Sequence, residues 1–227
     1  MPNNRAFVFY DGNNLYHNLL ETLKYYTNPL SRNYNSALQY VKPKDLDLFK
    51  LSEAICSHFG IKHEQSLYYN SVPSITDNPI VYTAHQNYLT WVASLTKFKV
   101  ETRPLQRKST RERLRDALSG LNGVAFCNSC KPLAENTCRS CIGSMDVKEK
   151  GIDVKLAISM VFHAFNKNCE NCILISGDSD FVPALELVKL LGCQSFSASF
   201  YHGYATELRN NFKFLVINDK LILKCLK

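Results

Sequence analysis

Two carboxylates one residue apart interrupt an apolar run in the last third of the chain. The stretch reads I-L-I-S-G-D-S-D-F-V-P-A-L, so Asp178 and Asp180 follow residues that are typical of a buried strand. Asp11 likewise follows an apolar run near the N-terminus, and Asp153 lies at the start of a long apolar segment. Carboxylates that are packed together repel one another unless a cation neutralises them. Because oxygen ligands suit Mg²⁺ or Mn²⁺, the four acids are candidates for a metal site.

Each acid also has a purely structural interpretation. Asp180 could cap the helix that follows it, because Pro183 is tolerated in a first helical turn. Asp11 and Gly12 could form only a turn, and Asp153 could simply favour the N-terminal end of a helix dipole. Taken singly, these interpretations are at least as good as a metal site. Four acids at one edge of a fold are more negative charge than a structural role needs.

The elements that must position these acids are strands that alternate with helices. Continuous apolar strands in such an alternation predict a three-layer α/β/α fold with a mainly parallel central sheet. Ligands bind outside the carboxyl ends of such strands, so the acids converge if the strands that precede Asp11 and Asp178 are neighbours. Strands are predicted at 6–10, 61–72, 98–104, 172–176, 194–200 and 214–217. Helices are predicted at 13–24, 45–59, 77–96, 152–165, 181–191 and 205–211.

Two segments between these elements have a distinctive composition. Residues 152–165 are apolar nearly all round, which predicts a buried helix. Residues 25–45 are rich in Asn, Ser, Tyr and Pro without a clear period, so we expect an irregular excursion. Its tyrosines could stack on bases or simply pack.

Composition places the chain among globular proteins of a reducing compartment. Its 227 residues are 45% hydrophobic and 21% charged, which is enough to bury a core. No run approaches the ~20 apolar residues of a membrane-spanning helix, and the N-terminus lacks the pattern of a signal peptide. Nine cysteines without a secretion signal indicate reduced thiols and a cytoplasmic protein.

Positive charge is concentrated between residues 97 and 115. The net charge of +7 is compatible with a polyanionic partner such as RNA but does not demand one. A charge run of this kind is usually a solvated face, although few acids balance this one. The candidates for contacts with substrate phosphates are Arg103, Arg107, Lys108 and Arg111, together with Lys150, which is two residues before the helix predicted at 152–165.

Four of the cysteines form two CxxC pairs, Cys127 with Cys130 and Cys138 with Cys141. Four thiolates at this spacing predict a closed tetrahedral site for a structural Zn²⁺ ion. The pairs would make a zinc-binding loop at about 127–141, within an inserted basic segment at 105–147 of a single domain that spans 1–227. A third pair, at 169 and 172, adjoins a buried strand, and core packing is favoured there over a redox role.

Three blocks of the sequence resemble the signature blocks of the NYN domain, a group of PIN-like nucleases that includes the bacterial LabA-like proteins. The blocks are F-V-F-Y-D-G-N-N at 7–14, K-G-I-D-V-K-L-A at 150–157 and L-I-S-G-D-S-D-F-V-P at 174–183. They occur in the family order, and the resemblance extends from the first predicted strand to about residue 217. The last block is the most specific of the three.

The resemblance implies a PIN-like fold and a metal-dependent ribonuclease. By position, the acidic cluster would be Asp11, Asp153, Asp178 and Asp180. Asn14 would match the polar residue that helps to order the site, and Ser176 the small hydroxyl residue before the acids. The implied reaction is in-line hydrolysis of an RNA phosphodiester, in which one or two Mg²⁺ or Mn²⁺ ions lower the pKa of the attacking water.

The chain departs from the family pattern at one position. Many relatives have Leu-Ala-x-Asp after the middle acid, whereas this chain has Leu156-Ala157-Ile158-Ser159. If the missing acid contributes to metal binding, activity here would be weaker. Six residues along a helix rotate by about 240°, so an acid at this position and Asp153 are not expected to face the same ion.

Two other function classes compete with the ribonuclease. A non-catalytic RNA-binding or adaptor protein that retains a vestigial metal site would explain Ser159, and it predicts salt-sensitive RNA binding without turnover. A phosphatase-like hydrolase has less support, because no Asp-x-Asp pair follows the first predicted strand. The sequence leaves the oligomeric state open, with a homodimer as one arrangement.

Overall fold

The computed structural model describes residues 4–75, 78–107, 115, 118–119, 127–141, 147–148 and 151–227. The chain divides into two compact units. The first unit combines Met1–Arg103 with Gly151–Lys227, and the second is Pro104–Lys150. Lys108, Arg111 and Lys150 of the predicted phosphate contacts lie outside the described residues.

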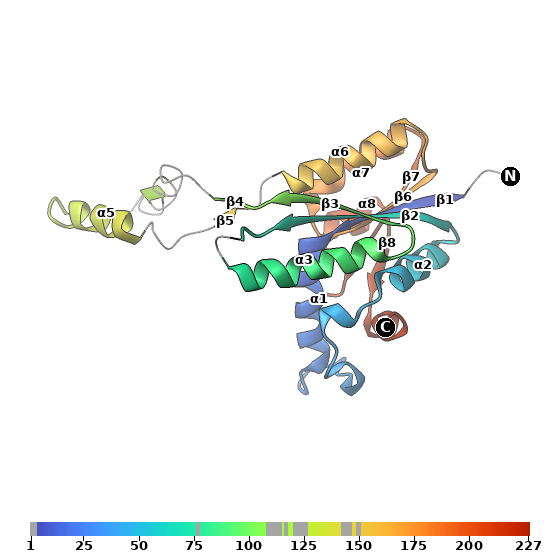
Figure 1. Cartoon of the computed structure of the whole chain (residues 1–227), viewed down its shortest axis with the longest axis horizontal. Coiled ribbons are helices and arrows are strands. Elements are labelled where there is room, and N and C mark those ends of the chain that lie inside the picture. The colour runs from blue at the N-terminus through green and yellow to red at the C-terminus, as the bar shows by residue number, and fades with distance from the viewer. Residues whose placement is uncertain are drawn as a thin grey trace. The chain divides into compact units, whose positions relative to one another are not determined.

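A six-stranded sheet forms the centre of the first unit (Figure 1). The strand order is β3-β2-β1-β6-β7-β8, and β1 pairs in parallel with both β2 and β6. All six strands predicted from the sequence are present, so the predicted α/β fold with a parallel sheet is confirmed. The strands are β1 (Arg5–Asp11), β2 (Lys62–Val72), β3 (Phe98–Pro104), β6 (Asn171–Ile175), β7 (Gln194–Phe200) and β8 (Lys213–Ile217).

Helices cover both faces of this sheet, as the continuous apolar strands require. Successive residues of β1 point to opposite faces, so Val8 and Tyr10 belong to one core and Phe7 and Phe9 to the other. Figure 1 shows α2 and α3 on one side of the sheet and α6 and α7 on the other. The first core is covered by α1 (Gly12–Thr27), α2 (Leu48–Phe59), α3 (Pro79–Ser94) and α9 (Asp219–Lys224). The second is covered by α6 (Ile152–Phe165), α7 (Val182–Leu190) and α8 (Thr206–Asn211).

Local signals in the sequence explain where several helices begin and end. Asp47 caps α2 by accepting hydrogen bonds from the backbone N–H groups of Phe49 and Lys50. The same helix ends at Gly60, which has φ of 69°, a left-handed conformation that glycine adopts without a steric cost. The excursion predicted at 25–45 is partly regular, because α1 continues to Thr27 and two short 3₁₀ helices follow at Ser36–Leu38 and Pro43–Asp45.

The prediction of a fully buried helix at 152–165 is wrong for one face of α6. Ile152, Leu156 and Met160 are buried against the sheet, as a spacing of four residues requires. Val154, Ile158, Phe162 and Phe165 are exposed on the opposite side. The apolar pattern therefore identified the helix correctly but not what covers its outer face.

The second unit contains two short strands and the helix α5, and residues 115 and 118–119 are helical as well. β4 (Gln106–Arg107) and β5 (Val147–Lys148) are antiparallel, and α5 spans Cys130–Cys141. The loop predicted at 127–141 is therefore mostly helical, a correction that bears on the zinc prediction.

Candidate active site

The order of the strands marks one position on the carboxyl edge of the sheet. From β1 the chain proceeds outward through β2 and β3, and from β6 it proceeds in the opposite direction through β7 and β8. The topological switch point therefore lies between β1 and β6, which is where open parallel sheets bind their ligands. Asp11 ends β1 and Ser176 directly follows β6. The condition set by the sequence, that these two strands are neighbours, is met.

Asp11 is held by hydrogen bonds from two sides. Its Oδ1 accepts from the backbone N–H of Asn14 at 3.2 Å, which caps α1. Its Oδ2 accepts from the hydroxyl of Ser176 at 2.8 Å. The side chain of Asp11 is buried, with 7% of the residue exposed. The carboxylate therefore has a fixed orientation at the end of β1.

Ser176 connects Asp11 to the loop that carries the next acid. While its hydroxyl donates to Asp11, the same oxygen accepts from the backbone N–H of Asp178 at 3.1 Å. Asn14 braces this loop from α1, because its Oδ1 accepts from the backbone N–H of Gly177 at 2.8 Å. The structure thus brings together four of the residues predicted for the site: Asp11, Asn14, Ser176 and Asp178.

Sequence reasoning missed a second layer of residues that supports this loop. Asn18 lies one turn after Asn14 on α1 and donates to its Oδ1 at 2.7 Å and to the carbonyl oxygen of Gly203 at 3.3 Å. Gly177 packs so closely that a Cβ atom there would meet the Gly203 carbonyl. The spacing of the two asparagines, four residues apart on one helix, is the signal that would have pointed to Asn18.

An aromatic cluster lies further along the same helix. Tyr25 stacks on Tyr201 with ring centroids 5.0 Å apart, and it also packs edge-on against His202. The backbone N–H of His202 donates to the hydroxyl of Thr22. Tyr25 and its neighbour Tyr26 thus pack within the fold.

Asp178, not Asp180, acts as the helix cap after β6. The Asp178 carboxylate accepts from the backbone N–H of Asp180 at 2.9 Å and starts the 3₁₀ turn Ser179–Phe181. No side-chain cap bond is made at the start of α7, which begins at Val182. Capping by Asp180 is therefore wrong, because the turn begins two residues earlier than the sequence suggested. Asp180 is exposed.

Asp153 lies in the first turn of α6, as predicted, and is exposed. Across the described ranges, no three Asp, Glu, His or Cys side chains form a group that could hold a metal ion. The oxygen donors at the switch point nevertheless fit a hard divalent cation, since Mg²⁺ is usually held by one or two carboxylates and keeps several waters. Among the predicted acids, Asp11 and Asp178 are the two that the hydrogen bonds of Ser176 connect, through the Asp11 carboxylate and the Asp178 backbone N–H.

Ser159, the position at which the chain departs from the family pattern, faces the sheet. Its side chain hydrogen-bonds to the hydroxyl of Tyr69, a buried residue of β2. Burial raises the pKa of Tyr69 to about 12, and this hydrogen bond opposes the rise. Tyr69 is the register partner of Asp11 across β1 and β2. An acid at position 159 would therefore lie over the strand next to Asp11.

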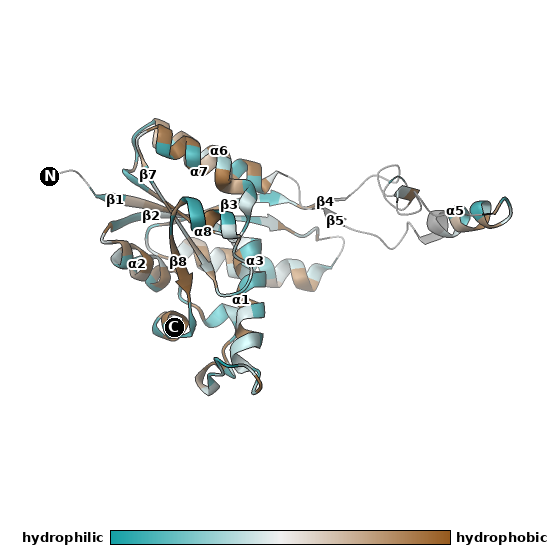
Figure 2. Ribbon diagram, turned by 180° about the vertical axis from the view of Figure 1, so that it is seen from behind, coloured by the Kyte–Doolittle hydropathy of each residue, from teal (hydrophilic) through white to brown (hydrophobic). Residues whose placement is uncertain are grey.

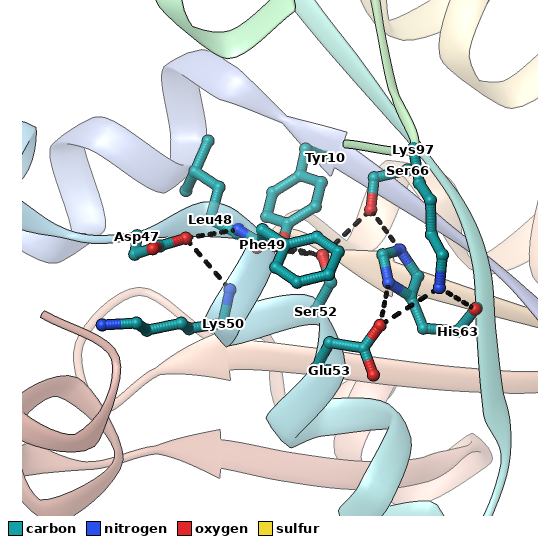
Figure 3. A network of polar contacts seen from close by, with 10 residues as sticks. All are labelled: Tyr10, Asp47, Leu48, Phe49, Lys50, Ser52, Glu53, His63, Ser66 and Lys97. Atoms are coloured by element: carbon teal, nitrogen blue, oxygen red, sulfur yellow. Dashed lines mark hydrogen bonds and ion pairs between the residues drawn. The ribbon is translucent and has the colours of Figure 1, made fainter. Parts of the chain in front are cut away.

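Elsewhere in the first unit, Ser66, His63 and Glu53 are hydrogen-bonded in the order of a catalytic triad, but a substrate has no access to the serine (Figure 3). His63 contacts Glu53 through Nδ1 at 2.9 Å and Ser66 through Nε2 at 2.8 Å. Ser66 continues to Ser52 at 2.9 Å, which contacts the hydroxyl of Tyr10 at 2.7 Å. Because Ser66 is fully buried, no substrate can reach it, and the network is part of the core.

The basic residues predicted to contact phosphates are only partly placed. Arg103 is exposed at the end of β3, and its guanidinium group lies beside Gly151 at the start of α6. Arg107 is placed only as a backbone position of β4. Lys97 of the same charge run is engaged within the fold, where its Nζ donates to the carbonyl oxygen of His63 at 2.8 Å and pairs with Glu53 at 3.3 Å.

The first CxxC pair has geometry that favours a thiolate. The backbone N–H of Cys130 donates to Sγ of Cys127 at 3.3 Å. A hydrogen bond from the Cys130 thiol and bonds from the backbone lower the pKa of the Cys127 thiol. Eight residues of helix separate Cys130 from Cys138, a rise of about 12 Å. Four thiolates about 2.3 Å from one zinc ion cannot span that distance while α5 is intact.

Five cysteines of the first unit are buried: Cys56, Cys169, Cys172, Cys193 and Cys225. The third CxxC pair consists of Cys169 and Cys172, which are 4% and 0% exposed. A hydrogen bond with Cys193 and burial raise the pKa of the Cys169 thiol, which makes it a poor nucleophile. The predicted role of this pair in core packing is confirmed.

The fold and this strand edge define a PIN-like α/β domain: a doubly wound parallel sheet with polar and acidic residues at its switch point. The chain belongs to the NYN domain family, whose model matches residues 5–218. Membership of this family implies a nuclease, which acts on nucleic acid, and PIN-like nuclease domains generally need divalent metals.

One solved structure has the same fold. It is the crystal structure of a protein of unknown function from Vibrio parahaemolyticus. The two chains are 12% identical, and they superpose with a TM-score of 0.53 over 98% of this chain and 96% of the other. The comparison with curated proteins found no match to this chain. Among the helices of the described residues, none has the length and apolar character to span a membrane.

Proposed function

We propose that the protein is an endoribonuclease that hydrolyses RNA phosphodiester bonds with Mg²⁺ or Mn²⁺ bound at the carboxyl edge of β1 and β6. One observation carries the proposal. The hydroxyl of Ser176 joins the Asp11 carboxylate to the loop of Asp178 at the switch point of the sheet. This arrangement ties the Asp11 carboxylate to the backbone of the Asp178 loop, which supports a site at the position where such sheets bind ligands.

The residues of this edge have distinct roles in the proposal. Asp11 and Asp178 would hold the ion, with Asp153 and Asp180 as the remaining acids of the proposed site. A bound divalent ion would lower the pKa of the attacking water and offset the negative charge on the phosphate. Ser176 fixes the orientation of Asp11. Asn14 positions the loop through Gly177, so the two carboxylates stay in place while the substrate binds.

The proposed substrate contacts are the basic residues predicted from the sequence. Lys150, Arg107, Lys108 and Arg111 are proposed to bind RNA phosphates together with Arg103, whose exposed side chain lies beside Gly151. Because each phosphate contact releases counterions, RNA binding is expected to weaken as the salt concentration rises.

The test is cleavage of a labelled single-stranded RNA by the purified protein with Mg²⁺ or Mn²⁺. We expect EDTA to abolish cleavage, and we expect Asp11→Asn and Asp178→Asn to reduce it at least 100-fold, the scale of electrostatic stabilisation lost with one group. Glu64→Gln is the matched control, because Glu64 is an exposed acid near the opposite end of β2. Cleavage that survives both aspartate substitutions would refute the proposal.

A non-catalytic RNA-binding role is the second candidate, and Ser159 favours it. The family acid is missing there, and the described residues contain no group of three metal-ligating side chains. An adaptor of this kind would bind RNA in a salt-sensitive manner without cleaving it under any divalent metal. A filter-binding assay beside the cleavage assay separates the two functions.

We also propose that the two CxxC pairs bind a structural Zn²⁺ ion and that the protein works in the reducing cytoplasm. The lowered pKa of Cys127 and the free thiols of the described cysteines support this. Because α5 separates the pairs, zinc binding would require part of this helix to unwind. The test combines zinc stoichiometry with far-UV circular dichroism: we expect one ion per chain and a loss of helical signal. A protein that binds no zinc would refute the proposed ion.

A further inference from the structure

The outer face of α6 is apolar although nothing in the first unit covers it. Val154, Ile158, Phe162 and Phe165 are 60%, 63%, 58% and 69% exposed. At 100° per residue these four side chains fall within about 80° of the helix surface. Surface helices normally carry polar residues on this side. Figure 2 shows the apolar residues recurring along α6.

The neighbouring helix α7 extends this surface. α6 and α7 pack on the same face of the sheet, so the sides that they turn away from it are next to one another (Figure 1). On α7, Leu187 is 43% exposed and Leu190 is 83% exposed. We call the exposed apolar side chains of the two helices the α6–α7 patch: Val154, Ile158, Phe162, Phe165, Leu187 and Leu190.

The α6–α7 patch is as large as the largest apolar patches on typical monomers. With about 150–250 Å² for a complete aromatic side chain, Phe162 and Phe165 alone expose on the order of 250 Å². The six side chains together expose roughly 600 Å², at the upper end of the largest patch on a typical monomer. That area is close to the ~800 Å² that each partner buries in an interface of standard size.

We infer that the α6–α7 patch is an interface between two copies of this chain. The four α6 residues are spaced symmetrically about a point near residue 160. When two such helices cross antiparallel about a twofold axis at that point, Val154 faces the partner's Phe165 and Ile158 faces the partner's Phe162. Each contact then pairs an aliphatic side chain with an aromatic one, and each occurs twice, as an isologous interface requires.

The geometry of the helix also suits this pairing. Side chains four residues apart form the ridges that interdigitate in the commonest class of helix packing. An antiparallel crossing places the N-terminal end of each helix dipole near the C-terminal end of the other, which is the favourable arrangement. The inference is independent of the proposed nuclease activity, because none of the patch residues belongs to the candidate active site.

The test is the mass of the full chain in solution, measured by light scattering and by sedimentation over a wide concentration range. We expect twice the 25.9 kDa of one chain. Ile158→Glu and Phe162→Lys should each shift the protein to the monomer, with the far-UV circular dichroism unchanged. Ile80→Glu is the matched control, because Ile80 is an isoleucine of α3 that is 82% exposed and lies outside the patch. It should stay dimeric.

The register has its own test. When the Ile158→Glu and Phe162→Lys variants are mixed, the introduced carboxylate faces the introduced ammonium group across the twofold axis. The mixture should therefore recover the dimer that neither variant forms alone. A wild-type protein that is monomeric throughout the concentration range would overturn the inference, and so would a dimer that survives both substitutions. A mixture that remains monomeric would overturn the antiparallel register.

Discussion

The hydrogen bonds of the Ser176 hydroxyl should contribute measurably to the stability of the candidate site. Ser176→Ala removes the donor to the Asp11 carboxylate and the acceptor for the backbone N–H of Asp178. A hydrogen bond to a charged group contributes about 1.5–3 kcal/mol, and a buried group left unsatisfied adds to the loss. We therefore expect the free energy of unfolding to fall by about 2–3 kcal/mol. For a chain of this length, that is a fall in Tm of roughly 4–12 °C.

The assay is urea denaturation followed by circular dichroism in buffer with EDTA, so that metal binding does not contribute. Ser197→Ala is the matched control. Ser197 is a fully buried serine of β7, and its hydroxyl has no hydrogen-bond partner among the described residues. Removing an unsatisfied hydroxyl should change the free energy of unfolding little or increase it.

A double-mutant cycle with Asp11→Ala isolates the contact between Asp11 and Ser176. The two substitutions should couple by more than 1 kcal/mol, roughly the value of a single hydrogen bond to a charged partner. Equal effects of Ser176→Ala and Ser197→Ala, or no coupling with Asp11→Ala, would refute the reasoning. Either result would show that the Ser176 hydroxyl does not hold the Asp11 carboxylate in place.

Three further predictions concern other parts of the domain. Ser159→Asp should tighten Mn²⁺ binding by about tenfold, equivalent to 1.4 kcal/mol of added attraction. The reason is that position 159 lies against Tyr69, beside the end of β1. Calorimetry that finds the same Mn²⁺ affinity for the Ser159→Asp and Ser159→Asn variants would contradict this prediction. Burial lowers the pKa of His63 below its unfolded value of about 6.5, so the unfolded state takes up the proton first and stability falls as pH drops below about 6.5. Urea titrations at pH 7 and pH 5 should show this loss, and His63→Asn should reduce it. Gly177→Ala should destabilise the domain by about 1–3 kcal/mol through overpacking against the Gly203 carbonyl, and an unchanged Tm would show that the loop yields freely.

The strands and half of the candidate site could be predicted because their signals are local. Apolar runs that end at polar residues located all six strands of the sheet. The rule for parallel sheets then placed Asp11 and Asp178 at one edge, once β1 and β6 proved to be neighbours. The capping role was assigned to the wrong acid, since Asp178 and Asp180 are both good cap residues and only the backbone decides between them.

The other features of the fold and of the candidate site could not be predicted, because they depend on tertiary contacts between residues that are far apart in the sequence. Asn18 reaches Gly203, a residue 185 positions away, and this contact exists only after α1 packs against the loop that follows β7. The helical pattern of α6 was recognised, but an apolar pattern does not state which side is covered by the same chain. In α5, the CxxC spacing suggested a loop although residues 130–141 form a continuous helix.

The central claim is that Asp11 and Asp178 hold a divalent ion at the switch point between β1 and β6. The most direct measurement is anomalous diffraction from crystals of the protein grown with Mn²⁺. We expect a peak in contact with both carboxylates, and the same peak should be lost in the Asp178→Asn variant. A Mn²⁺-saturated crystal with no peak at this edge, or with its peak elsewhere in the first unit, would show that these two carboxylates do not hold the ion.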